Sequence, residues 1–440
     1  MAAGGMGACL FALALLAVVD LAAAQVFVPA STNSVGLSPS ALAVVDVLGD
    51  GRADLVTANT AGNTLSVLIN INGVGGGFVL ASSPGANNGP QAIAAADVNG
   101  DGKVDIICAN QTDGTLTVLT NNGIGGFLIA TNPSVGASNP LSVAAADVNG
   151  DGKVDLISAN YNLAGTLTVT TNAGNNVFVI SQILSVGSYP CSVIAADVNG
   201  DGKVDLICAN NGNGAGSTLT VMTNNGAGRF VLSASPGVGS APICVTAADV
   251  NGDGKVDLIC ANYTASGTLT VLTNNGIGKF VTASSPGVGS YPAWVAAGDV
   301  NGDGKVDLIT ANYGANTLSV LTNKSAGFFV AAALLGVGTQ PDSVVVADVN
   351  GDGKPDLICA NYIDNTVTVL TNNFAFTLPN LSIAAAGNQV IVYYPMSNLH
   401  FTLQTVTNLS STNWVTASNG VPVTAFTFSN TAPASFYRLH

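Results

Sequence analysis

The sequence predicts an all-β protein in which a seven-bladed β-propeller precedes a small C-terminal β module. Three observations predict this fold. A nine-residue acidic loop recurs seven times, successive loops start 49 to 52 residues apart, and four short β-type runs fall within each repeat. Four-stranded repeats with a period of this length are typical of propeller blades.

The acidic loops carry the clearest chemical signal. Six of the seven match D-V-N-G-D-G-K-x-D. A plain Asp/Asn/Gly turn is the alternative interpretation, but six near-identical copies at one period favour a common ligand. The seven loops are Asp46–Asp54, Asp97–Asp105, Asp147–Asp155, Asp197–Asp205, Asp249–Asp257, Asp299–Asp307 and Asp348–Asp356.

The loop chemistry suits Ca²⁺, which takes six to eight oxygen ligands. In the second loop, side-chain oxygens stand at positions 1, 3, 5 and 9, and they belong to Asp97, Asn99, Asp101 and Asp105. We expect Lys103 at position 7 to offer its main-chain carbonyl while its ammonium points away. Glycine at position 6 allows the sharp turn that folds these ligands around one point.

The first loop departs from the pattern, because Leu48 stands where the other loops have Asn. We therefore expect the Asp46–Asp54 site to be degenerate and about six calcium sites to remain. None is an EF-hand, because position 12 of the second loop is Cys108 and not the bidentate Glu of that motif. The expected metal ligands are Asp97, Asn99, Asp101, Lys103, Asp105, Asp147, Asn149, Asp151, Lys153, Asp155, Asp197, Asn199, Asp201, Lys203, Asp205, Asp249, Asn251, Asp253, Lys255, Asp257, Asp299, Asn301, Asp303, Lys305, Asp307, Asp348, Asn350, Asp352, Lys354 and Asp356.

The composition supports metal binding and disfavours other partners. All 25 acidic residues are Asp, 21 of them lie in the loops, and the formal net charge is −14. The acidity is therefore site chemistry. Nucleic acid is disfavoured because no basic patch could meet phosphates. No stretch reaches the roughly 18–20 apolar residues of a membrane-spanning helix.

The N-terminus predicts export. The apolar run Leu10–Val19 and the small residues Ala22–Ala24 resemble a signal-peptide core and its cleavage site. A terminus without defined structure is the alternative, because no Lys or Arg precedes the run. We expect a signal peptide at 1–24, the propeller at 25–378 and the C-terminal module at 379–440. The protein is then secreted or displayed at the cell surface.

Each repeat reads as one four-stranded blade. In the sixth, the expected strands are Ala293–Val300, Val306–Ala311, Asn316–Thr322 and Phe328–Ala332. A proline seven residues before each loop suits the entrance of a strand. An Ala-Asn pair closes every second strand, where Asn can bond its own backbone in a turn. The extra strand Val26–Ser31 is expected to complete the last blade beside Thr366–Thr371, although Phe376–Leu378 competes for that place.

The cysteines suggest buried positions. Four of them share one repeat position, which Ser or Thr occupies in the other repeats, so a small buried side chain is expected there. They are Cys108, Cys208, Cys260 and Cys359. A disulfide between Cys191 and Cys244 remains open.

The D-V-N-G-D-G-K-V-D loops on a period of about 50 residues resemble FG-GAP/VCBS repeats, which build the integrin α-subunit head and many secreted bacterial proteins. The resemblance covers about residues 26–378. It implies a seven-bladed propeller with calcium held by loop positions 1, 3, 5, 7 and 9. The segment Leu403–Trp414 and the terminal Phe436–Leu439 resemble a small C-terminal module of secreted bacterial proteins.

A binding role is expected, and an enzyme is not. Titratable groups outside the loops are few, and no His precedes His400. Aromatic residues recur on the face opposite the loops and could stack on an extracellular glycan or contact a protein. They are Tyr161, Tyr189, Tyr263, Tyr291, Trp294, Tyr313 and Tyr362. The alternatives are a scaffold without a ligand, in which these residues only cover the blade ends, and an enzyme acting on polysaccharide.

Overall fold

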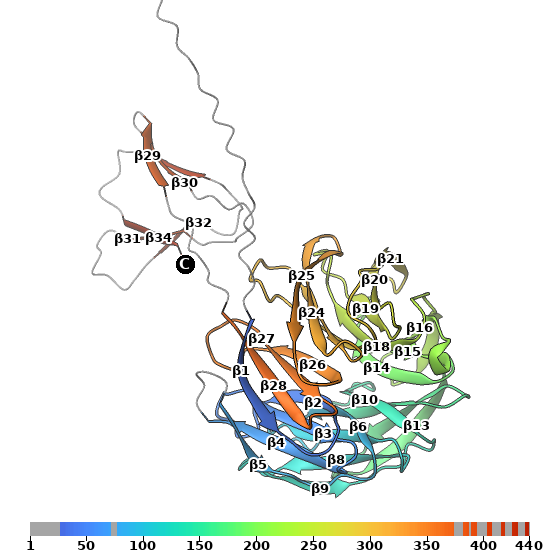
Figure 1. Ribbon diagram of the computed structural model, residues 1–440. Coiled ribbons are helices and arrows are strands. Elements are labelled where there is room, and N and C mark those ends of the chain that lie inside the picture. The colour runs from blue at the N-terminus through green and yellow to red at the C-terminus, as the bar shows by residue number, and fades with distance from the viewer. Residues whose placement is uncertain are drawn as a thin grey trace, which may run out of the picture.

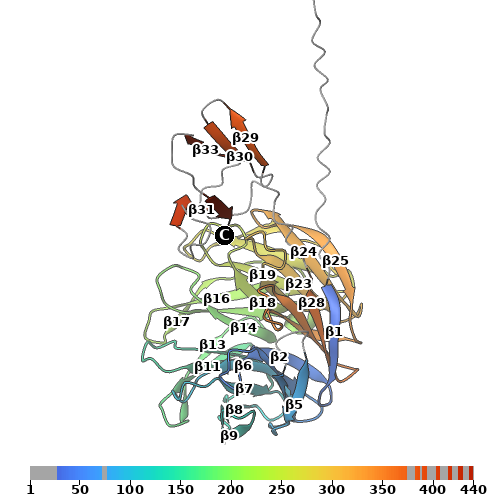
Figure 2. The same cartoon turned by 90° about the vertical axis from the view of Figure 1, so that its left-hand side faces the viewer.

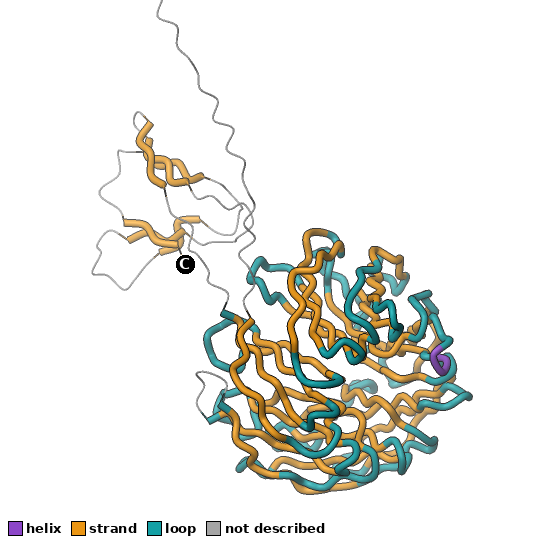
Figure 3. Tube along the Cα trace, viewed as in Figure 1, coloured by secondary structure: helices purple, strands orange, loops and turns teal. Residues whose placement is uncertain are grey.

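The computed structural model describes residues 27–71 and 77–373, together with six strands of the C-terminal module. The expected signal peptide and the segment Phe376–Leu378 lie outside the described residues. The regular secondary structure of the described chain consists of β-strands and one short 3₁₀ turn at Gly212–Gly214, and loops connect the strands (Figure 3).

Seven four-stranded antiparallel sheets form the blades. Blade 1 contains β2 (Pro39–Val45), β3 (Asp54–Asn59), β4 (Thr64–Asn70) and β5 (Phe78–Ser82); blade 2 contains β6 (Pro90–Ala96), β7 (Asp105–Asn110), β8 (Thr115–Asn121) and β9 (Phe127–Thr131); blade 3 contains β10 (Pro140–Ala146), β11 (Asp155–Asn160), β12 (Thr166–Asn172) and β13 (Phe178–Ser185); blade 4 contains β14 (Pro190–Ala196), β15 (Asp205–Asn210), β16 (Thr218–Asn224) and β17 (Phe230–Ala234). Blade 5 contains β18 (Pro242–Ala248), β19 (Asp257–Asn262), β20 (Thr268–Asn274) and β21 (Phe280–Ser284); blade 6 contains β22 (Pro292–Gly298), β23 (Asp307–Asn312), β24 (Thr317–Ser325) and β25 (Phe328–Gly336); blade 7 contains β26 (Pro341–Ala347), β27 (Asp356–Asn361), β28 (Thr366–Asn372) and β1 (Phe27–Ser34).

The blades close into a ring. The first strand of each repeat contacts the first strands of both neighbouring repeats, and β26 contacts β2, so these strands form the innermost circle. The colour in Figure 1 passes around this ring from blue to orange. The all-β, seven-bladed propeller expected from the sequence is confirmed.

The N-terminal strand closes the ring, as expected. β1 pairs antiparallel with β28, from Phe27 opposite Asn372 to Ser34 opposite Thr366. This pairing runs three residues past the expected end at Ser31. Figures 1 and 2 both show the blue β1 beside the orange β28. Blade 7 therefore joins the two ends of the propeller segment and leaves β28 without an open edge.

The hydrophobic core lies between blades. Every second strand is buried along its whole length, because both of its faces pack against other blades. One cluster, for example, joins Val56 and Val67 of blade 1 to Ile106 and Leu119 of blade 2. Apolar burial therefore stabilises the contact of each blade with its neighbour as well as the blade itself.

The proline and the Ala-Asn pair of each repeat lie at the strand ends where they were expected, but the Asn has a different role. Each innermost strand begins at its proline, and each second strand ends at the Asn of the Ala-Asn pair. That Asn does not bond its own backbone in a turn. Instead, the Asn110 Nδ2 donates to the hydroxyls of Thr115 and Thr117, at 3.2 and 2.9 Å. The side chain is buried, so it satisfies its donors inside the sheet.

A second Asn, at the end of each third strand, fastens each blade to the one before it. The Asn121 Nδ2 donates to the carbonyl of Val47 in blade 1 at 2.9 Å. All seven blades have this bond, at 2.7 to 2.9 Å, and Asn70 of blade 1 reaches Val349 of blade 7. We call this set of bonds the Asn clamp. Its donors are Asn70, Asn121, Asn172, Asn224, Asn274, Asn323 and Asn372.

The cysteines of the propeller are buried and free. The four that share one repeat position lie inside second strands, as expected. The disulfide left open between Cys191 and Cys244 is not formed. Cys191 instead directs its Sγ to the Pro242 carbonyl at 3.2 Å.

The C-terminal module contains two three-stranded sheets. The sheets are β29 (Ser382–Ala386), β30 (Gln389–Tyr393) and β33 (Ala425–Ser429), and β31 (Leu403–Val406), β32 (Val415–Ser418) and β34 (Phe436–Leu439). β31 lies at the start of the segment Leu403–Trp414 that the sequence singled out, and β34 coincides with the terminal Phe436–Leu439.

The Asn clamp predicts an asymmetric effect of two adjacent substitutions. Asn121→Ala should lower the free energy of unfolding by roughly 1–3 kcal/mol, because the buried Val47 carbonyl loses its partner. Asn122→Ala, in the exposed turn that follows, should cost clearly less. Urea unfolding of both variants measures the difference, and equal losses would show that the clamp does not hold the blades.

Candidate functional site

Each acidic loop joins the innermost strand of a blade to the second strand, so all seven loops lie on one face of the ring. In the second loop, Asp97 at position 1 organises the turn. Its Oδ1 accepts hydrogen bonds from the amides of Gly100 and Asp101, at 2.7 and 3.2 Å, and its Oδ2 accepts from Gly102 at 2.8 Å. Gly100 and Gly102 have φ angles of 78° and 82°, which other residues adopt only with strain. All seven loops repeat this arrangement.

Positions 3, 5 and 7 form the exposed rim of the loop. The Asn99 Oδ1 accepts from the Asp101 amide at 2.8 Å, and the Asp101 Oδ1 accepts from the Lys103 amide at 2.9 Å. The bond from the Lys103 amide, followed by the bond from its side chain, lowers the pKa of Asp101.

The lysine ammonium does not point away, contrary to the expectation. The Lys103 Nζ lies 3.1 Å from the Asp101 Oδ2, and the equivalent pairs in the other Lys-containing loops span 3.3 to 3.8 Å. The position 5 carboxylate is the nearest negative charge that this long side chain can reach. A calcium ion at this carboxylate would therefore compete with the ammonium.

Position 9 belongs to the core. Asp105 is fully buried; its Oδ2 accepts from the Val98 amide at 3.2 Å and its Oδ1 from the Asn121 amide at 2.8 Å. Burial raises the pKa of Asp105, the two amide bonds oppose the rise, and the charges of Asp101 and Asp97 add to it. The equivalent Asp307 has the largest shift of these residues, to about 7, and burial is again its main cause.

The donor set of each complete loop fits calcium. Its side-chain donors are carboxylate and amide oxygens, the ligand type that Ca²⁺ prefers. A carboxylate has about four lone-pair sites, so the amide bonds to Asp97 and Asp105 leave acceptor capacity unused. The charges of positions 1, 5 and 9 act on one another. Within the described residues, however, no three acidic, Cys or His side chains converge as a ready metal cluster.

The first loop differs at the position that the sequence singled out. Leu48 cannot accept the amide bond of Asp50 that Asn99 accepts from Asp101 in the second loop. The Arg52 guanidinium pairs with the Asp50 carboxylate instead, and this bond is the main reason that the pKa of Asp50 is lowered. The loop keeps the turn of the others but has one oxygen donor fewer.

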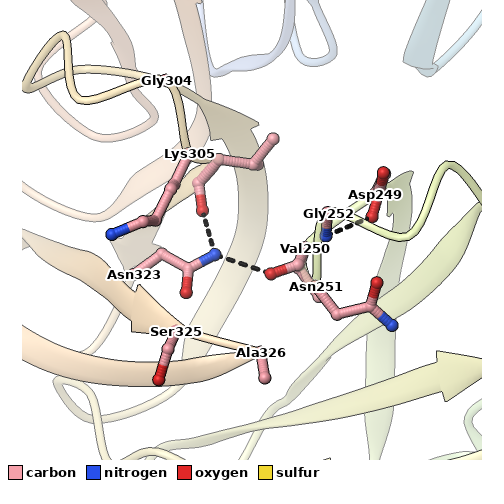
Figure 4. A pocket seen from close by; sticks show the side chains of 10 residues that line it. Asp249, Val250, Asn251, Gly252, Gly304, Lys305, Asn323, Ser325 and Ala326 are labelled. Atoms are coloured by element: carbon pink, nitrogen blue, oxygen red, sulfur yellow. Dashed lines mark hydrogen bonds between the residues drawn. The ribbon is translucent and has the colours of Figure 1, made fainter. Parts of the chain in front are cut away.

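Clefts lie between neighbouring loops. One, of about 340 Å³, lies between the loops of blades 5 and 6, and a second of about 200 Å³ lies between blades 6 and 7. In Figure 4 the side-chain amide of Asn323 bridges the first cleft at its base. It donates to the carbonyls of Val250 and Val306, at 2.7 and 3.1 Å. The Asn clamp thus lies directly beneath the acidic loops.

The aromatic residues lie on the opposite face, and none of the seven is fully buried. Four tyrosine rings form a connected run, which we call the tyrosine arc: Tyr291, Tyr263, Tyr313 and Tyr362. Their successive centroids lie 5.2, 6.1 and 6.4 Å apart. Tyr161 and Tyr189 form a separate pair at 5.1 Å. Trp294 is half-buried and packs against two interblade clusters.

Two tyrosines of this face have strained backbones. Tyr189 and Tyr291 precede the prolines of their blades and have φ angles of 53° and 50°. Bulky residues are rare in this left-handed region, where Gly and Asn cost less. Blades 2 and 3 use Gly89 and Asn139 at the same position. Ser38, Ala241 and Gln340 also have positive φ angles there, so all seven blades share this conformation and it belongs to the turn that enters each innermost strand.

The Asn clamp was missed at the sequence level, although a signal exists. An Asn stands at or near the end of the third strand in all seven repeats. Strict recurrence of a polar residue inside an apolar run indicates a buried hydrogen bond.

Comparison with protein families decides the assignment. A family model described as an FG-GAP-like repeat matches six overlapping segments, at 46–108, 97–158, 147–208, 197–260, 249–310 and 299–359. The chain belongs to the FG-GAP-like repeat family. Each FG-GAP match begins at one acidic loop and ends three residues after the next, so it spans the junction of two blades. The chain matches no curated protein.

Solved structures share the fold at low identity. A crystal structure of BBS1N in complex with ARL6DN, soaked with lead, has a TM-score of 0.56 and 13% identity, and the match covers 80% of this chain and 98% of that one. A putative 6-phosphogluconolactonase from Bacteroides uniformis has a TM-score of 0.54 and 15% identity, covering 69% and 87%. Such likeness supports the propeller fold alone. The part of the chain that the structure describes contains no helix long and apolar enough to cross a bilayer.

The loop geometry predicts different roles for two carboxylates of one loop. In excess chelator, Asp105→Ala should lower the free energy of unfolding by roughly 1–3 kcal/mol for each buried amide left unpaired. Asp101→Ala removes an exposed ion pair and the bond from the Lys103 amide, which water can replace, and should have little effect under the same conditions. Urea unfolding tests this ranking, and a larger loss for Asp101→Ala would contradict it.

Proposed function

We propose that this FG-GAP propeller is a secreted or cell-surface binding module, stabilised by calcium, that recognises an extracellular glycan or protein through the aromatic face. Positions 1, 3, 5, 7 and 9 of the six complete loops would hold calcium. The ion would neutralise the net charge of −2 that three carboxylates and one lysine give each loop, and it would do no chemistry. A stable ring would then present the tyrosine arc on the opposite face.

The observation that carries the binding role is the tyrosine arc. Its rings touch across blades 5, 6 and 7 and keep part of their surface exposed, and Tyr291 is 40% exposed. Tyrosines offer rigid, amphipathic area that stacks on sugar rings or anchors protein interfaces. We assign no catalytic residue.

A scaffold role has its own support. The seven outermost strands contain no charged residue and expose apolar side chains, such as Leu128 and Val231 at 66% and 65%. Uncharged open edges favour side-by-side association. A scaffold would assemble through this perimeter and would not need the tyrosine arc.

Calcium should stabilise the ring. Excess chelator should lower the melting temperature of the full chain by on the order of 10 °C, and added calcium should restore it, because six sites each contribute by mass action. An unchanged melting curve in chelator would show that the loops are turns only.

The first loop provides a gain-of-site test of the calcium ligands. Leu48→Asn restores the missing oxygen donor and should raise the calcium stoichiometry by one, measured by calorimetric titration. The matched variant Asn99→Leu should lower it by one. Stoichiometries that do not change in opposite directions would contradict the ligand assignment.

Recognition should depend on the tyrosine arc. Tyr291→Ala should weaken binding of the calcium-loaded chain on a glycan array, or to a captured protein, at least about tenfold, as expected for a central aromatic contact. Trp294→Ala should do the same, with its melting temperature checked because Trp294 also packs in the core. Ile124→Ala, at an exposed side chain on the loop face, is the control. Binding that survives both aromatic substitutions would favour the scaffold.

A further inference from the structure

The two faces of the ring differ in charge. Among residues 27–71 and 77–373, every Lys and Arg lies in an acidic loop, in the turn between a third and a fourth strand, or, for Lys324, at the end of β24 next to that turn. All of these segments are on the loop face. The opposite face has no cation to offset its three carboxylates, which belong to Asp113, Asp342 and Asp364. This face therefore attracts positive charge.

Only one of these three carboxylates lacks a partner in the described residues. Asp113 accepts from the amide and the Nδ2 of Asn88, and Asp364 accepts from the Thr339 amide. Asp342, by contrast, is half-buried and has neither a hydrogen bond nor an ion pair within 27–71 and 77–373. A carboxylate that is partly withdrawn from water without a partner costs stability, so its retention needs a reason.

The repeat geometry places Asp342 beside the tyrosine arc. It is the second residue of an innermost strand, and in blade 2 this position, Gln91, bonds to Gln111, the residue after the Ala-Asn pair, at 3.1 Å. The equivalent neighbour of Asp342 is Tyr362. In blade 1 the residue after Ala-Asn, Thr60, also donates to the carbonyl of Pro90, the first residue of the next blade, at 2.7 Å.

By the same equivalence, Tyr313 of blade 6 reaches the start of blade 7, where Asp342 lies. The electrostatics agree with this placement. Burial raises the pKa of Tyr313, and the charge of Asp342 is the next cause. Burial raises the pKa of Tyr263 to about 12, and the charges of Tyr313 and Asp342 add to the rise. The repeat pairing thus places Asp342 next to Tyr362, and its charge acts on Tyr313 and Tyr263.

We propose that Asp342 and the tyrosine arc form a binding subsite for an alkylammonium group. This inference rests on the proposed binding function and adds that the ligand carries a positive charge. The carboxylate supplies the counter-charge, and the phenol faces attract a cation through their quadrupoles. The ammonium could come from a lysine of a protein or from an amino sugar, the two partner classes already considered.

Other ligand classes fit less well. A divalent metal needs more oxygen ligands than one carboxylate and neutral phenols offer. An anion would meet the unpaired carboxylate. A neutral hydroxyl could bond to Asp342 but would leave its charge uncompensated.

The subsite should respond to pH. Burial raises the pKa of Asp342 to about 7, so the free carboxyl is half-protonated near neutrality and must lose its proton to pair with a cation. The other titratable groups near it are the Tyr263 and Tyr313 phenols and the Cys359 thiol, whose pKa values are raised and which stay neutral from pH 6 to 8. A lysine side chain stays protonated over this range. Its affinity should therefore increase about tenfold between pH 6 and pH 8.

Calorimetric titration of the full chain in calcium tests the proposal. The first probe is Nα-acetyl-lysine methylamide, with its Nε-acetylated form as the neutral control. Glucosamine at pH 6, with N-acetylglucosamine as its control, tests the sugar source. Asp342→Asn removes the charge without changing the shape, and Asp364→Asn is the matched control on the same face.

We expect the ammonium probes to bind the wild type and Asp364→Asn, and to bind Asp342→Asn at least tenfold more weakly. Their affinity for the wild type should be higher than that of their acetylated forms. The lysine probe should lose its pH dependence in Asp342→Asn. The proposal would be overturned if the charged and acetylated forms bound with equal affinity, or if the ammonium probes bound Asp342→Asn as tightly as the wild type. Tighter binding of the lysine probe or of glucosamine at pH 6 identifies the source. Array binding without any amine binding overturns this inference alone, whereas absence of both overturns the binding function too.

Discussion

One continuous circuit of hydrogen bonds holds the ring together, and a buried carboxylate stands at each of its joints. Asp105 accepts from the amides of Val98 and Asn121. The Asn121 side chain donates to the carbonyl of Val47, whose own amide donates to Asp54 of blade 1. The circuit therefore passes from blade to blade through side chains and loops, and it continues through all seven. Because a buried carboxylate is costly without such partners, the loop and the junction between blades form one unit.

The sequence predicts the features of the fold that are local or that recur in every repeat. It does not predict features that depend on what surrounds one particular side chain. The loop period and the prolines determine the blades, and the likeness of Val26–Ser31 to a fourth strand indicates the closure that β1 makes. The direction of the Lys103 ammonium depends on which carboxylate lies within its reach. The interblade reach of Asn121 likewise appears only once neighbouring blades are packed. Asp342 has no counterpart in the other repeats, so no pattern singles it out.

The two faces of this FG-GAP propeller divide structure from recognition in our proposal. The loop face gathers the lysines and most of the carboxylates in short-range pairs and amide bonds. The opposite face carries the tyrosine arc and Asp342, which has no hydrogen bond or ion pair within the described residues. The stability that the loops contribute lets the other face keep a half-buried carboxylate without a partner, which by itself lowers the stability of the fold.

Hydrogen–deuterium exchange resolved at single amides tests the central circuit most directly. The amides of Val98 and Asn121 both donate to Asp105. If the circuit holds the ring, both should exchange as slowly as the interior amides of β7, through global unfolding only. The amides of Gly100 and Gly102 donate to Asp97 in the exposed part of the same loop, so they should exchange much faster through local opening. Exchange of Val98 and Asn121 at the rate of those glycines would show that the blades are joined by apolar packing alone.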